Sequence, residues 1–276
     1  MGFRINTNVP SISAQRNLGI QKNFQDHTMQ KMASGQRISV AADDAAGLAI
    51  SEKLKAEIRS TRQAARNTND GISMIQTAEG GLNEVSNILV RLRELSVQSA
   101  SDTVGDVERG FTNKEVQHLK DEINRIAEVT KFNGTYLLNG MGNDLEFQVG
   151  TGSSAEKDRM VYQIAQSDSR ISKLGLDGIS VMTKQDAQQN LDKLDLAIQT
   201  ISGNRASLGA LQNRLSSTVA NLNVTEENLS AANSRIRDAD MASEAADLAK
   251  RNILTHAGTA VLAQANASEA LALKLL

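Results

Sequence analysis

The sequence predicts a mainly α protein in which long antiparallel helices form a coiled-coil-like bundle, with a small β-hairpin region in the middle of the chain. Apolar residues recur at heptad spacing through residues 44–100 and 186–236, and a short middle segment rich in Gly and Asn separates these stretches. Each stretch predicts one long helix with an apolar stripe, which needs a partner surface. Because a short connection folds the chain back, the two stripes are expected to bury each other.

The heptad pattern of the second half is strict. Residues seven apart lie almost above one another on a helix, so an unbroken row predicts a single long helix with one apolar seam. The first half carries the matching seam, with apolar and small residues spaced by alternating threes and fours. The core helix seam of the second half comprises Leu194, Ile201, Leu208, Leu215, Leu222, Leu229 and Ile236. Its counterpart comprises Leu54, Ile58, Thr61, Ala65, Thr68, Ile72, Ile75, Ala78, Leu82, Val85, Leu89 and Leu92.

Composition limits both the core and the chemistry. Aromatic residues make up only 3% of the 276 residues, and Trp and Cys are absent, so Leu, Ile, Val, Met and Ala must fill the core. Without Cys there are no disulfides, thiol nucleophiles or thiolate metal sites. The net charge of -2 comes from interspersed acidic and basic residues. This pattern predicts solvated helix faces and no nucleic-acid partner.

Neither a membrane span nor a cleaved leader is predicted. No apolar run reaches the roughly 18 residues of a membrane-spanning helix, so membrane insertion is not expected. The residues after Met1–Asn6 lack the apolar core of a cleaved secretory peptide.

The first elements can be placed from their breaks and caps. Residues 3–35 carry a weak amphipathic pattern, and Pro10 predicts either a helix start nearby or a local kink. Ser34-Gly35 ends this segment. Asp43 or Asp44 is expected to cap the long helix that runs to about residue 100.

A third, shorter helix is predicted after a break at residues 101–105, because Val116, Leu119, Ile123 and Ile126 form a helical stripe. The pairs Asn133-Gly134 and Asn139-Gly140 then predict tight hairpin turns, since both residue types tolerate positive φ. Residues 145–149 and 160–164 are expected to be strands. Residues 132–184 should form a small β region that caps one end of the bundle.

The two chain ends have weaker apolar faces. The segment 237–276 is rich in Ala, which buries little area, so this helix is not expected to stay folded alone. Both ends are predicted to be disordered in the monomer and to fold when neighbouring copies supply the missing surface. The candidate assembly residues of these ends are Ile5, Val9, Ile12, Phe24, Met32, Leu248, Leu262, Leu271 and Leu275.

No motif indicates an enzyme, and no catalytic, cofactor-binding or metal site is predicted. His27, His118 and His256 are isolated from one another, and neither HExxH nor a phosphate-binding Gly-Lys-Ser/Thr loop occurs. The adjacent Asp43 and Asp44 resemble a carboxylate pair, but a helix cap explains them more simply.

A series of motifs runs through nearly the whole chain and resembles bacterial flagellin in the order of that family. The motifs are RINTN at 4–8, SGQRI at 34–38, AADDAAGLAISEKL at 41–54, NTNDGISMIQTAEGGLNE at 67–84, RLRELSVQSA at 91–100, KFNGTYLLNG at 131–140, LGALQNRL at 208–215, SRIRDADMASE at 234–244 and VLAQAN at 261–266.

The resemblance implies a structural subunit that polymerises with itself into the flagellar filament used for swimming. Residues 1–43 and 237–276 would form an inner domain, and residues 44–236 an outer core domain made of segments 44–131, 132–184 and 185–236. Only about fifty residues separate Phe132 from Gln185, so the outer variable domains of larger relatives are expected to be missing. The alternative is a hook–filament junction protein or another coiled-coil structural protein.

The resemblance also implies partners and a location. The expected partners are copies of the chain, the filament cap and hook-junction proteins, and an export chaperone at the C-terminal segment. Positions matching Arg91, Leu95 and Glu115 form a surface that an animal Toll-like receptor recognises. The subunit is expected in the extracellular filament, exported without a cleaved signal peptide.

Overall fold

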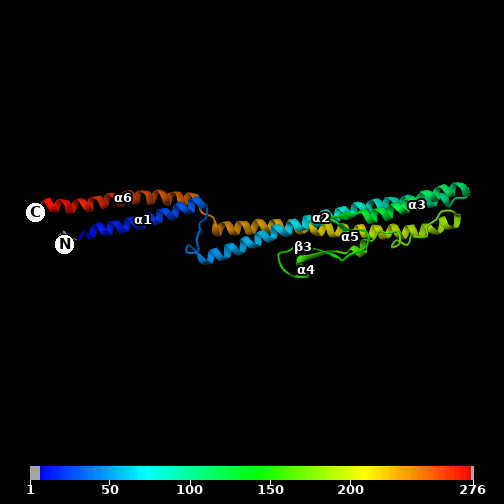
Figure 1. Cartoon of the computed structure of the whole chain (residues 1–276), viewed down its shortest axis with the longest axis horizontal. Coiled ribbons are helices and arrows are strands. Elements are labelled where there is room, and N and C mark those ends of the chain that lie inside the picture. Colours follow the sequence, from blue (N-terminus) through cyan, green and yellow to red (C-terminus); the bar gives the residue numbers. More distant parts are fainter. Residues whose placement is uncertain (1–6, 275–276) are drawn as a thin grey trace. The chain divides into compact units, whose positions relative to one another are not determined.

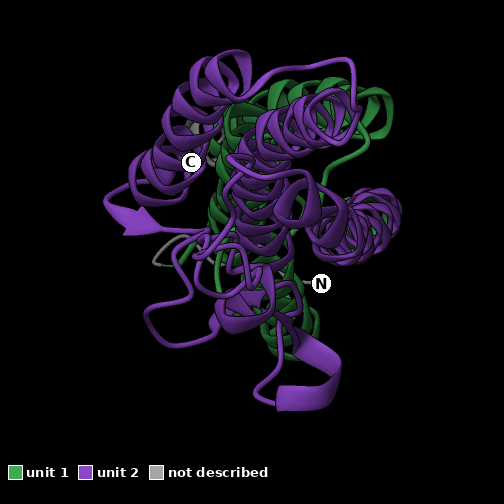
Figure 2. Cartoon of the chain, turned by 90° about the vertical axis from the view of Figure 1, so that its right-hand side faces the viewer, with its two compact units in different colours: residues 1–58, 227–276 green, residues 59–226 purple. Residues whose placement is uncertain are grey.

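The computed structural model describes residues 7–274 (Figure 1), with side chains described through residue 268. Two compact units are present, residues 1–58 together with 227–276 (unit 1) and residues 59–226 (unit 2), coloured green and purple in Figure 2. The helices are α1 Val9–Ser34, α2 Ala45–Ser99, α3 Asp106–Val129, α4 Ala155–Asp158, α5 Lys184–Arg237 and α6 Met241–Lys274, with a 3-10 turn η1 at Ile164–Ser167. The strands are β1 Lys131–Phe132, β2 Thr135–Tyr136, β3 Leu145–Gln148 and β4 Arg159–Tyr162.

In unit 2, α2 and α5 run antiparallel, as the two heptad-patterned stretches predict. Arg93 Nε lies 2.6 Å from Asp195 Oδ1 near one end of the pair, and Arg62 Nε lies 2.9 Å from Glu226 Oε1 near the other. Since the partner numbers on α5 rise as those on α2 fall, the two helices point in opposite directions. The mainly α fold with long helices and a small β region is confirmed.

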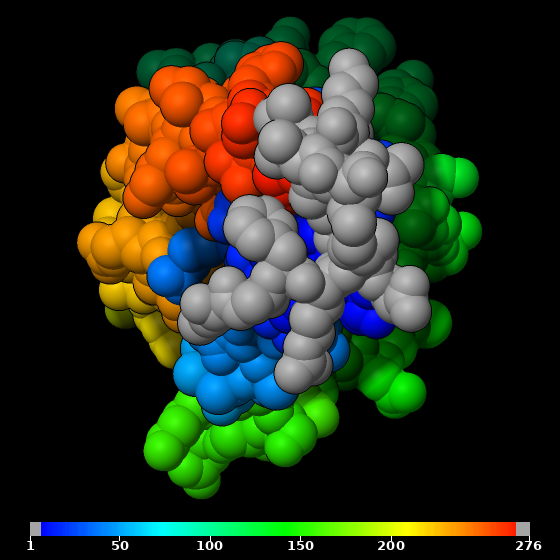
Figure 3. Space-filling model, turned by 90° about the vertical axis from the view of Figure 1, so that its left-hand side faces the viewer, coloured from blue at the N-terminus to red at the C-terminus, as the bar shows by residue number. Residues whose placement is uncertain are grey.

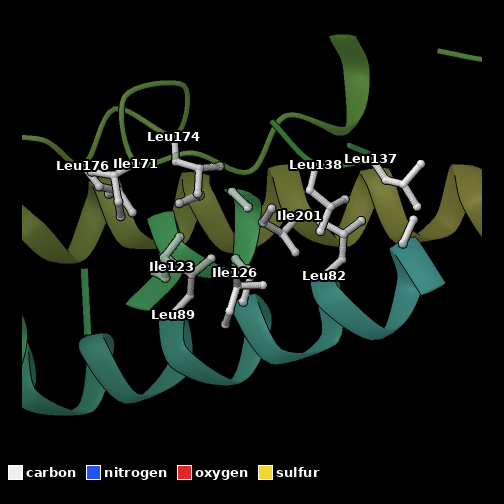
Figure 4. Close-up of a cluster of buried hydrophobic side chains, with 14 of the residues drawn as sticks. Leu82, Leu89, Ile123, Ile126, Leu137, Leu138, Ile171, Leu174, Leu176 and Ile201 are labelled. Carbon is white, nitrogen blue, oxygen red and sulfur yellow. The ribbon is translucent and has the colours of Figure 1, made fainter. Parts of the chain in front are cut away.

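The core of unit 2 lies between α2, α3, α5 and the middle segment (Figure 4). Leu82 and Leu89 of α2, Ile123 of α3 and Ile201 of α5 are fully buried there. The core helix seam divides into two parts. Leu194, Ile201, Leu208 and Leu215 are buried, whereas Leu222, Leu229 and Ile236 are half-buried.

The break between α2 and α3 is held by an arginine that the sequence pattern does not reveal. The Arg109 side chain, 10% exposed, donates from Nε to the carbonyl of Ser99 at 3.0 Å and from Nη2 to that of Ser101 at 2.9 Å. Its Nη1 lies 3.1 Å from Asp106 Oδ1. Arg109 therefore donates to the last carbonyl of α2, which has no helical partner, and to the Ser101 carbonyl in the turn that follows.

The first Asn-Gly pair makes the predicted hairpin. Asn133 and Gly134 have φ of 47° and 82° between β1 and β2, which pair antiparallel with Phe132 opposite Thr135. The positive φ at both positions is that of a type I′ turn. The hairpin interpretation of Asn139-Gly140 is wrong, because this pair connects β2 to β3, and β3 pairs with β4 instead. Asn139 Oδ1 accepts from the backbone N–H of Met141 and closes a local turn there.

The β region lies along the flank of the bundle and does not cap its end. The Phe147 ring of β3 approaches Gly71 of α2 so closely that a Cβ there would lie 3.1 Å away, and Leu138 stands beside Gly81 in the same way. Farther along, Lys184 Nζ lies 2.7 Å from Asp102 Oδ2. Because α3 covers only part of the long helices, the middle segment covers the remaining flank.

Candidate assembly surface

Unit 1 contains the helix pair formed by the two chain ends. Asn8 caps α1 by accepting from the N–H of Ser11 at 2.8 Å, and Pro10 lies in the first turn, where its missing donor costs little. Gly35, at φ 67°, ends the helix in the left-handed conformation. Of the two predictions made for Pro10, a helix start nearby or a local kink, the first is confirmed, because α1 begins at Val9.

Asp240 begins α6 by accepting from the N–H groups of Ala242 and Ser243 at 3.0 and 3.3 Å. Between the helices and the rest of unit 1, Ala239 N donates to Gly35 O, and Arg37 N donates to Arg237 O. Arg237 also pairs with Glu52 and lowers the pKa of that carboxyl. These contacts join the helix pair to the first turns of α2 and the last turns of α5, and unit 1 accordingly includes α2 up to residue 58 and α5 from residue 227.

The connection between α1 and α2 contains a carboxylate with several donors. Asp43 Oδ2 accepts from the N–H groups of Ser39 and Val40, and Asp43 Oδ1 lies 2.8 Å from His27 Nε2 of α1. Burial alone would raise the pKa of Asp43, but these donors outweigh burial and lower it to about 2. Asp44, in contrast, caps α2 by accepting from Gly47 N at 2.8 Å.

α1 and α6 are antiparallel and their shared seam is polar. Ser11 Oγ donates to Asn266 Oδ1 at 2.8 Å, and Gln25 Nε2 donates to Asn252 Oδ1 at 2.6 Å. The Arg251 guanidinium lies 4.7 Å from the centroid of the Phe24 ring. In Figure 3, the orange-to-red surface of α6 lies beside the blue surface of α1.

Large apolar side chains of this pair remain open to solvent. Among the predicted assembly residues, Val9, Ile12 and Phe24 are exposed, and Met32, Leu248 and Leu262 are half-buried. Ile5 and Leu275 lie outside the described residues, as does the side chain of Leu271. Ile20, Met29 and Met241 are exposed as well, and sequence reasoning missed three further exposed apolar residues of α6: Ile253, Leu254 and Val261.

Of the three residues predicted to match a Toll-like receptor surface, Arg91 and Glu115 are exposed and Leu95 is buried. Arg91 donates from Nη2 to Glu115 Oε1 at 2.9 Å and from Nη1 to Glu94 Oε2 at 3.1 Å, and both Arg91 and Glu115 are exposed. The hydrogen bonds to Glu115 raise the pKa of Arg91. Leu95 is only 2% exposed and packs in the core of unit 2.

Among the side chains described, those of residues 7–268, no cluster of three or more His, Asp or Glu is placed to hold a metal ion. None of the helices described there is both long and apolar enough to cross a membrane.

Comparison with known proteins places the chain in a family. The pattern of the bacterial flagellin N-terminal helical region matches residues 5–143, and that of the bacterial flagellin C-terminal helical region matches residues 191–276. The chain belongs to the bacterial flagellin family. Over 272 residues, it is 44% identical to the flagellin of Halalkalibacterium halodurans, and the match covers 99% of both chains. The flagellin of Bacillus subtilis is 39% identical, with 99% of this chain and 100% of that protein covered.

Solved structures agree with this membership. A Bacillus cereus flagellin crystal structure is 34% identical, has a TM-score of 0.50 and covers 57% of this chain and 88% of its own. A putative flagellar hook-associated protein from Vibrio parahaemolyticus, at 15% identity and a TM-score of 0.58, shares the fold alone. As a flagellin, the chain is a structural subunit of the extracellular filament and not an enzyme.

Proposed function

We propose that this flagellin polymerises through the apolar face of its terminal helix pair, whose helices become ordered as neighbouring copies cover them. The observation that carries the proposal is the exposure of large apolar side chains on both helices. Ile253 is 68% exposed, Val9 61% and Val261 60%. Exposure of large apolar side chains to water is unfavourable in free energy, and a neighbouring copy that covers them removes this penalty.

The expected energy favours contact with several neighbours. Full burial of one large aliphatic side chain stabilises by about 1.5–3 kcal/mol. The exposed parts of the apolar residues on α1 and α6 therefore represent on the order of 10 kcal/mol per subunit. Association itself costs roughly 4–15 kcal/mol in lost freedom, so a single contact covering part of the face is too weak to hold a subunit. A subunit at the filament end contacts several copies, so enough apolar surface is buried to outweigh the cost of association.

Contacts between two different faces of neighbouring subunits allow the polymer to keep growing at its end. When one face of a subunit contacts a different face of the next, the contacts need not close into a ring and continue as a helix. Ordering at the end of the filament also limits association in solution, because free chains must lose the entropy of both helices before they pair.

The exposed apolar face of the terminal helices also suggests where the other expected partners bind. The C-terminal segment 237–276 is the proposed site for an export chaperone, because its apolar side chains need cover before assembly. Cap and hook-junction proteins would contact the same face at the two ends of the filament. Export without a cleaved signal peptide suits a chain whose folding needs no disulfide, since it contains no Cys.

A Toll-like receptor would contact the Arg91–Glu115 pair directly. Leu95 would contribute by holding α2 in the core, because its side chain is 2% exposed. Receptor recognition by this chain is therefore proposed to depend on two exposed ionic side chains and one buried apolar one.

Seeded polymerisation followed by electron microscopy tests the proposal. The full chain is compared with a chain lacking residues 237–276 and with the double variant Ile253→Ser/Val261→Ser. The matched control, Ile253→Val/Val261→Ile, changes the same positions but keeps them apolar and β-branched. Long filaments are expected from the full chain and the control, and not from the other two. Normal filaments from the Ser variant would refute the proposed face, and no filaments from the full chain would favour a junction or stalk protein.

A further inference from the structure

The polar contacts between α1 and α6 follow one register along the whole pair. From Ser11 to Gln25 the chain advances by two heptads on α1, and from Asn266 to Asn252 it retreats by the same number on α6. Between these pairs, the Leu18 side chain faces Gly258, where a Cβ would lie 3.2 Å from Leu18 Cδ1. Two side-chain hydrogen bonds and one close Leu–Gly contact therefore belong to a single alignment.

Apart from the Arg251–Phe24 contact, which belongs to the same alignment, the seam has few contacts that distinguish one alignment from another. Its buried positions on α1 include Ser11 and Thr28, at 7% and 4% exposure, and α6 is rich in Ala. When the apolar surface is small and uniform, moving one helix by a heptad changes the buried area little. Register must then come from polar partners, as a buried Asn does in coiled coils.

A slip of one heptad removes each of these contacts. In one direction Gln25 would face Thr259 and Leu18 would face Ala265. In the other direction Gln25 would face Ala245, and Leu18 would meet the longer side chain of Arg251. Either slip separates the Gln25 amide from the Asn252 amide. Opposite Ala245 the Gln25 amide has no side-chain partner, which is costly in a seam, and opposite Thr259 it meets only a shorter hydroxyl.

We propose that the Gln25–Asn252 and Ser11–Asn266 hydrogen bonds, with Leu18 seated on Gly258, determine the register of the terminal helix pair. The register decides which apolar side chains of α1 and α6 lie next to one another on the exposed face. Its consequence for filaments rests on the proposed function; the register is read from cross-links within one chain, so a failure to polymerise and an unchanged cross-link ratio are separate outcomes.

Disulfide cross-linking reads the register directly, because the natural chain has no Cys. Gln21→Cys/Thr255→Cys, three residues along each helix from the Leu18–Gly258 contact, reports the observed alignment. Gln21→Cys/Leu262→Cys and Gln21→Cys/Leu248→Cys report the two alignments slipped by one heptad. Each reporter is copolymerised with an excess of natural chain and oxidised, and intramolecular cross-links are separated from those between copies by mass spectrometry.

The test compares three backgrounds. Gln25→Leu/Asn252→Leu removes one hydrogen-bonded amide pair from the seam. Asn23→Leu/Gln264→Leu is the matched control, because it replaces the same two residue types at exposed positions of the same helices. Gln25→Asn/Asn252→Gln keeps an amide on each side and tests rescue.

The first background is expected to raise the slipped cross-links relative to the observed one by roughly fivefold, the ratio that corresponds to the net contribution of one hydrogen bond. The control and the rescue variant should leave the ratio near its natural value. The ratio is read in the incorporated fraction, where the terminal helices are proposed to be ordered, and the soluble fraction serves as the reference. An unchanged ratio in Gln25→Leu/Asn252→Leu would overturn the proposal even if filaments form normally, and an equal rise in the control would also overturn it.

Discussion

Truncation of a buried seam residue should destabilise unit 2 far more than the same change at a neighbouring exposed position. Leu194 is 0% exposed and Leu196, on the same helix, is 65% exposed. Leu194→Ala removes apolar atoms from the core and leaves a cavity, so it should lower the free energy of unfolding by about 3–4 kcal/mol. Leu196→Ala should change it by less than about 0.5 kcal/mol.

Tyrosine fluorescence during urea unfolding measures this difference. The chain has no Trp, and its two Tyr residues, Tyr136 and Tyr162, both lie in unit 2, with Tyr162 3% exposed. The signal therefore reports unit 2 without a contribution from unit 1. A loss of about 3 kcal/mol corresponds to a melting temperature lower by roughly 6–12 °C. Equal losses for the two variants, or a loss below about 1 kcal/mol for Leu194→Ala, would refute the assignment of the seam to the core.

Three further changes test other contacts. Arg109→Ala should lower the free energy of unfolding of unit 2 by about 2 kcal/mol, because buried carbonyls of the α2–α3 turn lose a charged donor; Arg109→Leu should not restore it in urea titrations. The Asp43 pKa lies at about 2 in the folded chain against 3.8 for the free side chain, so its stabilising effect should be complete above about pH 4 and disappear as the pH falls to about 2. Circular dichroism of the natural chain and Asp43→Asn over this range should converge at the acid end. Finally, Arg91→Ala should reduce activation of a Toll-like receptor in a reporter assay. Its free energy of unfolding should stay within about 1 kcal/mol of that of the natural chain, since the ion pair with Glu115 is exposed.

Heptad spacing was sufficient to predict the long helices, because a seam of Leu and Ile that recurs at every seventh position from Leu194 to Ile236 of the 54-residue α5 has few other ways to become buried. The hairpin at Asn133 also follows from local chemistry, since two adjacent residues must adopt positive φ. Asn139-Gly140 has the same dipeptide but no partner strands of matching register. A dipeptide therefore predicts a turn more reliably than it predicts which strands pair.

Long-range polar contacts were not predictable from spacing. Arg109 reaches back to carbonyls ten and eight residues away, and Asn113 and Asn190 hold the backbone near Ser180 from two different helices. Each such residue is an ordinary polar residue in the sequence, and only the path of the chain gives it a partner. The same holds for Gln25 and Asn252, which are 227 positions apart.

The polar seam between α1 and α6 has a thermal consequence. The heat-capacity change of unfolding scales mainly with the apolar surface that becomes exposed, and polar surface contributes with the opposite sign. A helix pair joined by Ser, Gln and Asn should separate with a small heat-capacity change, while the Leu- and Ile-rich core of unit 2 should unfold with a large one. The free energy that holds α1 against α6 should therefore change little with temperature, whereas association of the exposed apolar face with neighbouring copies should weaken on cooling, as apolar burial does.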